Sequence, residues 1–112
     1  MSRKYNWTTG PVRSSLGYDS TLIVLSNDSS KTQKVEVRFY DLGYTPKKRI
    51  LSKSITLELE DTKSVDTRRP EVACWEVQIS ADSKDVRAWI GGRRLNSNLP
   101  GNIILNPELQ RY

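Results

Sequence analysis

The chain has 112 residues, which fits a single domain that is large enough for one hydrophobic core. Hydrophobic residues make up 36% and charged residues 28%, a balance that excludes a disordered chain and a membrane protein. The net charge of +5 permits contact with nucleic acid, an anionic surface or an acidic protein, and selects none of them.

Targeting and redox signals are sparse. The longest apolar run, Leu22 to Leu25, is far shorter than the ~20 residues of a membrane-spanning helix. No apolar stretch follows the basic N-terminus, so no secretory signal is visible and we expect a cytoplasmic location. Cys74 is the single cysteine, and a lone thiol fits a reducing compartment. We expect it to be a packed and unreactive side chain.

The first third of the chain predicts a loop followed by a hairpin. Residues 1–19 are expected to be irregular, because Gly10-Pro11 is a turn signal. A strand is predicted at 21–26, where four consecutive apolar residues indicate burial on both faces or a β-bulge. The short polar residues of 27–31 favour a turn, and a second strand is predicted at 33–41.

Two segments alternate apolar and polar residues, which is the period of a strand with one buried face. The first is 35–40, and the second lies within a strand predicted at 72–80. The residues expected to face inward are Val35, Val37, Phe39, Ala73, Trp75, Val77 and Ile79. The residues expected on solvated outer faces are Glu36, Arg38, Glu76 and Gln78.

Between these segments a third strand is predicted at 50–60. Its apolar residues of one parity are Leu51, Ile55, Leu57 and Leu59, and Lys53 interrupts them. A brief pairing is expected at 64–66, before the break at Arg68-Arg69-Pro70.

The last third predicts two more strands. The first is 86–90, which Gly91-Gly92 is expected to end or kink. Pro100-Gly101 suits a type II turn, and the last strand is predicted at 102–105. We therefore expect one domain over residues 20–106 and a short tail at 107–112.

Six or seven short strands separated by turns indicate an all-β fold, an antiparallel β-sandwich or barrel, and we expect a single antiparallel β-sandwich. Over residues 20–105 the spacing resembles immunoglobulin-like and fibronectin-like sandwiches, and Trp75 resembles their core tryptophan. The paired cysteines of true immunoglobulin domains are missing, so the resemblance implies such a sandwich without a disulfide.

Catalytic signals are weak. The chain has no histidine, which removes the commonest general base and the usual metal ligand. Glu58 and Glu60 would lie ~7 Å apart on one strand face, within the range of glycosidase carboxylates. That face is polar, and nothing near it would raise a carboxyl pKa, so we expect a solvated face. We expect no enzyme, no cofactor and no metal site.

The most suggestive group is basic and aromatic. Arg87 and Trp89 project from one face of the strand at 86–90, away from its inward residues. Exposed aromatics interleaved with arginine are typical of protein interfaces and of stacking on bases. The alternative is that Trp89 lies inside, between a sheet and the N-terminal segment. The expected interaction surface comprises Arg87, Trp89, Arg93, Arg94, Arg38 and Tyr40.

The sequence therefore predicts a non-catalytic structural or protein-interaction module. A protein partner or self-association through an exposed strand edge is expected, with no membrane and no small-molecule substrate. The alternative is a basic β domain that binds single-stranded nucleic acid through the same surface.

Overall fold

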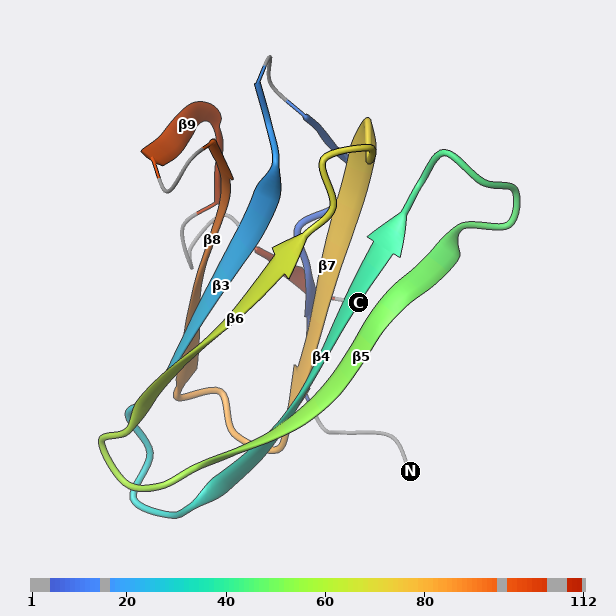
Figure 1. Ribbon diagram of the computed structural model, residues 1–112. Coiled ribbons are helices and arrows are strands. Elements are labelled where there is room, and N and C mark those ends of the chain that lie inside the picture. The colour runs from blue at the N-terminus through green and yellow to red at the C-terminus, as the bar shows by residue number, and fades with distance from the viewer. Residues whose placement is uncertain (1–4, 15–16, 95–96, 105–108, 112) are drawn as a thin grey trace.

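The computed structural model describes residues 5–14, 17–94, 97–104 and 109–111. Ten strands lie in these residues and form two antiparallel sheets (Figure 1). The strands are β1 (Tyr5–Thr8), β2 (Val12–Arg13), β3 (Ser20–Asn27), β4 (Gln33–Asp41), β5 (Lys48–Leu57), β6 (Thr62–Arg68), β7 (Cys74–Ala81), β8 (Val86–Arg94), β9 (Ser97–Ile104) and β10 (Gln110–Arg111).

One sheet has the order β10-β1-β7-β4-β5, with β2 also paired to β7, and the other has the order β6-β3-β8-β9. The two sheets face each other and bury one core between them, so the fold is an all-β antiparallel sandwich. No helix in the part of the chain that the structure describes is long and apolar enough to cross a membrane.

The strand order departs from that of an immunoglobulin domain in one place. If β3 is taken as the B strand, β6 and β7 occupy the E and F positions. The next strand of an immunoglobulin domain lies beside F in the same sheet. Here β8 leaves the sheet of β7 and pairs with β3. The immunoglobulin-like type is therefore not confirmed, whereas the two-sheet β fold is.

The alternating segments form the centre of the core as predicted. Six of the seven expected inward residues are buried, namely Val35, Val37, Phe39, Trp75, Val77 and Ile79, while Ala73 precedes β7 and is exposed. The Trp75 ring stacks between Tyr18 and Phe39, with centroid distances of 6.3 Å and 6.0 Å. Burial raises the pKa of the Tyr18 phenol to about 12.

The N-terminal segment is more regular than expected. β1 and β2 both pair with the same edge of β7, on either side of Gly10, which has a φ of +66°. Two strands of four and two residues are too short to show a period in the sequence. At the other end, β10 pairs with β1, so the expected tail contributes to the same sheet.

The third predicted strand ends earlier than expected. β5 ends at Leu57, and Leu59 is 56% exposed. Glu60 adopts a left-handed φ of 57°, and the Asp61 N–H donates to the Glu58 carbonyl over 3.1 Å. The prediction that Glu58 and Glu60 share a strand face is therefore wrong, because both lie in a turn.

Three other strands are longer than the sequence indicated. β6 covers residues 62–68 instead of 64–66, and β8 continues through Gly91-Gly92. β9 begins at Ser97 and includes Pro100-Gly101. In place of the expected turn, the pairing register between β8 and β9 is irregular. Leu105, the last residue of the predicted strand, lies outside the described residues.

A buried asparagine connects the turns at one end of the sandwich. The Asn27 side-chain amide donates to the carbonyls of Lys31 (2.8 Å), Leu57 (3.1 Å) and Glu58 (3.1 Å). Its Oδ1 accepts from the Ser29 N–H over 2.9 Å. Asn27 is fully buried, so these bonds satisfy its side-chain amide, which water cannot reach, and the bond to the Leu57 carbonyl is buried as well. They hold the β3–β4 turn against the β5–β6 turn.

We expect Asn27→Ala to lower the free energy of unfolding by about 2–4 kcal/mol, because it leaves several buried polar groups without partners. Urea denaturation measures the change. Asn98→Ala, at an exposed position of β9, is the matched control and should change the free energy of unfolding by less than about 0.5 kcal/mol. Equal effects of the two substitutions would contradict the role assigned to Asn27.

Candidate interaction surface

The outer face of the four-stranded sheet carries the tryptophan that the sequence singled out. On β8 the residues Val86, Ala88 and Ile90 face the core, and Arg87 and Trp89 face outward, as the alternation predicts. Trp89 is half-buried. The N-terminal strands lie in the other sheet, so they do not cover Trp89.

The Trp89 ring lies against Gly91 of its own strand. A Cβ atom built on Gly91 would be 2.4 Å from Cη2 of Trp89. Only glycine therefore leaves room for the indole to lie along the sheet. Across the strand pair, Val24 is opposite Trp89 and Leu22 is opposite Gly91, and both are half-buried. We call Leu22, Val24, Trp89 and Gly91 the Trp89 patch.

The patch borders a shallow hollow of about 170 Å³ lined by Val24, Ser26, Arg87, Ala88 and Trp89. Charged residues stand around it. Arg87 forms an ion pair with Asp28 over 2.8 Å, and more than half of each side chain is exposed. Ser20 of β3 is paired with Arg93 of β8 on one side and with Arg68 of β6 on the other. Leu22 of β3 is paired with Asp66 of β6.

Arg94 follows at the end of β8 and is exposed. A Cβ atom on Gly17 would be 2.6 Å from the Arg94 Cδ, so the stem of this arginine packs over that glycine. Gly17 itself has a φ of +86°. Arg94 therefore lies at the end of the sheet, beyond the row that holds Trp89.

Arg38 and Tyr40 do not join this surface. They lie on the outer face of the six-stranded sheet, since β4 belongs to that sheet. Arg38 pairs with Glu36 over 3.3 Å and donates to the Ser80 Oγ over 2.7 Å. The Lys47 ammonium lies 4.9 Å from the Tyr40 ring centroid. The expected set of six residues is thus divided between opposite faces of the sandwich.

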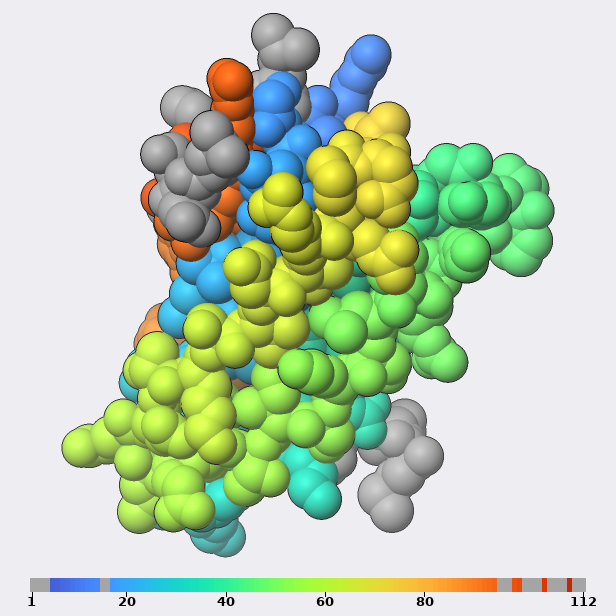
Figure 2. Space-filling view, viewed as in Figure 1, coloured from blue at the N-terminus to red at the C-terminus, as the bar shows by residue number. Residues whose placement is uncertain are grey.

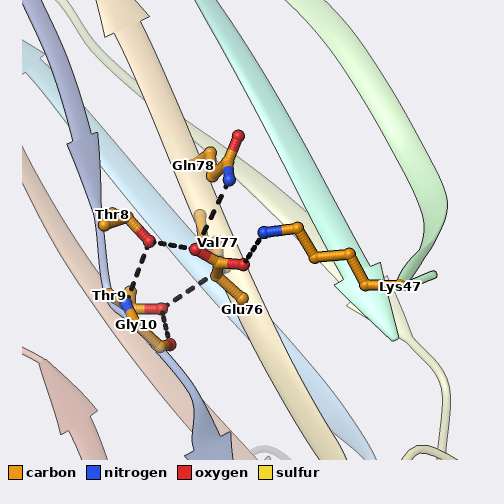
Figure 3. A network of polar contacts seen from close by, with 7 residues as sticks. All are labelled: Thr8, Thr9, Gly10, Lys47, Glu76, Val77 and Gln78. Atoms are coloured by element: carbon orange, nitrogen blue, oxygen red, sulfur yellow. Dashed lines mark hydrogen bonds and ion pairs between the residues drawn. The ribbon is translucent and has the colours of Figure 1, made fainter. Parts of the chain in front are cut away.

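The same outer face buries a carboxylate that was expected to be solvated. Glu76 is only 7% exposed, because β1 and β4 flank β7 on both edges. Its carboxylate accepts hydrogen bonds from the Thr8 hydroxyl, from Lys47 over 2.6 Å and from Gln78 over 3.4 Å (Figure 3). The expectation of a solvated Glu76 was wrong, since only the sheet order shows what covers it.

These contacts also govern the charge on Glu76. Burial alone would raise the pKa of the carboxyl group, but the hydrogen bonds from Lys47, Thr8 and Gln78 outweigh it and lower the pKa below 4.5. The carboxylate is therefore charged at neutral pH and fully engaged by its neighbours. These hydrogen bonds connect β7 to β1 and to the segment between β4 and β5.

Other candidate chemistry is not assembled. In residues 5–14, 17–94, 97–104 and 109–111 no three acidic or cysteine side chains are grouped to hold a metal ion. Cys74 is free and half-buried at the start of β7.

A second hollow of about 160 Å³ was not anticipated from the sequence. It lies where the β4–β5 hairpin approaches the segment after β6, and Tyr44, Lys48, Arg49 and Arg69 line it with Asp41, Ile50 and Glu71. Its residues come from segments about 20 positions apart, and no local pattern brings them together.

We expect Glu76→Gln to lower the free energy of unfolding at pH 7 by about 1–3 kcal/mol, the value of a hydrogen bond to a charged group. The folded-state pKa of Glu76 is depressed, so its contribution is present above about pH 4.5 and is lost as pH falls through that pKa. Urea denaturation between pH 7 and pH 3 should therefore show the two proteins converging. Glu58→Gln, in an exposed turn, is the control; a gap that stays constant with pH would refute the assignment.

Comparison with known proteins gives one structural likeness. No family model matches the sequence, and no curated protein matches it. Among solved structures, the chain is similar to the Anabaena sensory rhodopsin transducer, with a TM-score of 0.48 and 16% sequence identity, over 86% of this chain and 86% of that one.

Proposed function

We propose that this chain is a non-catalytic protein-interaction module that binds its partner through the outer face of the four-stranded sheet. The observation that carries the proposal is the Trp89 patch. Strict alternation of apolar and polar residues would make the outer face of this sheet polar. Leu22, Val24 and Trp89 nevertheless lie side by side there and remain partly open to solvent. Partly exposed apolar side chains grouped on one face are typical of binding surfaces.

The composition of the patch and its surroundings fits an interface. Tryptophan and arginine are the residues that most often dominate binding energy, and a polar rim commonly surrounds the apolar centre. Here Trp89 is central, and Arg68, Arg87 and Arg93 lie on the same face. The carboxylates of Asp66 and Asp28 lie there as well, of which Asp28 pairs with Arg87, so the rim keeps an excess of positive charge. A second copy would bring the same arginines to the seam. The rim therefore favours an acidic partner over self-association.

Binding of single-stranded nucleic acid is the alternative use of this face. Aromatic stacking requires one continuous basic track along the strand of nucleic acid. Arg38 and Tyr40 lie on the opposite face, and Arg87 is paired with Asp28, which shortens such a track. Protein binding is therefore the function that the geometry supports better.

The test compares immobilised wild-type protein with Trp89→Ala and Trp89→Phe in capturing a partner from the native extract after nuclease treatment. We expect one partner to be retained by the wild type, reduced at least about tenfold by Trp89→Ala and partly restored by Trp89→Phe. Leu59→Ala removes an exposed apolar side chain from a turn and should have no effect.

Thermal unfolding of each variant shows whether the fold survives. A partner retained equally by folded Trp89→Ala would contradict the proposal. Binding that nuclease abolishes and that salt weakens steeply would instead establish the nucleic-acid alternative.

A further inference from the structure

β5 is a long strand with one unpaired edge. It has ten residues, about 33 Å of extended chain, whereas strands commonly have five or six residues. It pairs with β4, and no other described strand pairs with it. Figure 1 shows the β4–β5 hairpin projecting beyond the rest of the sheet. The outer edge of β5 therefore presents backbone N–H and C=O groups that a further strand could use.

Among the described residues, a hydrogen bond to the outer edge of β5 is found at its C-terminal end. Lys63 of β6 donates to the Thr56 carbonyl over 2.8 Å, close to the turn that joins the two strands. Beyond that point the strands separate into different sheets. Residues 48–54 are exposed or half-exposed, so the open portion of the edge is long enough for a partner strand.

The charge along the edge has one sign. Lys48, Arg49 and Lys53 are exposed, and β5 contains no acidic residue. Arg49 and Lys53 form no ion pair with any residue that the structure describes. If two copies paired through β5, three cations from each copy would share one seam, and such like-charge contacts are destabilising. An acidic strand would instead bring opposite charges together along this seam.

The hollow of about 160 Å³ extends this basic edge at the N-terminal end of β5. Arg49 and Lys48 reach it from the strand, and Arg69 reaches it from the segment after β6. The hollow is lined by these three cations and by two carboxylates, so its charge stays positive: Asp41 accepts from the Gly43 N–H over 2.8 Å, and Glu71 pairs with Arg69 over 3.6 Å. Figure 2 shows the hairpin standing out from the body of the molecule beside this segment.

We propose that β5 accepts an extended acidic segment of another protein as an additional strand of the six-stranded sheet. Main-chain hydrogen bonds to the open edge supply affinity. Carboxylates of the segment pair with Arg49 and Lys53, and one carboxylate enters the hollow beside Arg69. Cations on an edge strand normally prevent aggregation, and here the same charges select the partner. This site lies on a different sheet from the Trp89 patch and does not depend on it.

The probe is a fluorescent ten-residue peptide of alternating glutamate and valine with both ends capped. Its anisotropy is measured with the full chain. We expect binding to the wild type and a loss of affinity of about tenfold or more in Arg49→Glu plus Lys53→Glu. Lys84→Glu plus Arg94→Glu reverses the same number of exposed charges away from β5, and it should retain most of the affinity. Equal losses in both double variants would refute a specific site.

A second peptide separates strand addition from simple charge attraction. It carries the same sequence with every backbone nitrogen methylated, which keeps the charges and removes the N–H donors from both edges of the peptide. We expect this peptide to bind at least about tenfold more weakly, and the unmodified peptide to slow hydrogen exchange of β5 amides. Equal binding of the methylated peptide, equal binding of single-stranded DNA of the same length, or no binding of the first peptide would each overturn the proposal.

Discussion

The structure depends on the central position of β7, which has a neighbour along both edges. β4 pairs with one edge, and β1 and β2 share the other. Its inner face places Trp75 between Phe39 of the same sheet and Tyr18 of the segment that leads into β3, and the three rings stack in the core. The outer face of β7 also carries two buried polar side chains, Glu76 and Ser80, and buried polar groups must find partners within the protein.

The need for internal partners limits which surfaces of the protein remain open to a binding partner. Glu76 is bonded to Thr8, Lys47 and Gln78, while Ser80 connects Arg38 to Asn6. The polar groups on the outer face of the six-stranded sheet are therefore bonded to one another, and a partner would have to break buried contacts to use them. In the part of the chain that the structure describes, no such network lies over Trp89, and no second strand pairs with the outer edge of β5.

Local patterns in the sequence predicted which side of each strand is buried, because a period of two depends on one segment alone. The inward faces of β4, β7 and β8 follow it. What lies over an outer face depends on strand order, and no local pattern contains that order. For this reason Arg38 was grouped with Trp89 although they lie on opposite faces, and Glu76 was expected to be solvated. The hollow beside Arg69 was missed for the same reason.

Strand order also changes the meaning of the net charge of +5. Lys47 is bonded to the buried Glu76 and Arg38 to Glu36, so these cations are compensated within the protein. Arg49 and Lys53 have no such carboxylate among the described residues. Arg49 and Lys53 therefore add uncompensated positive charge to β5, where backbone donors and acceptors are also open. The proposed attraction of an acidic segment rests on the placement of these cations, since the total charge alone would act equally over every surface.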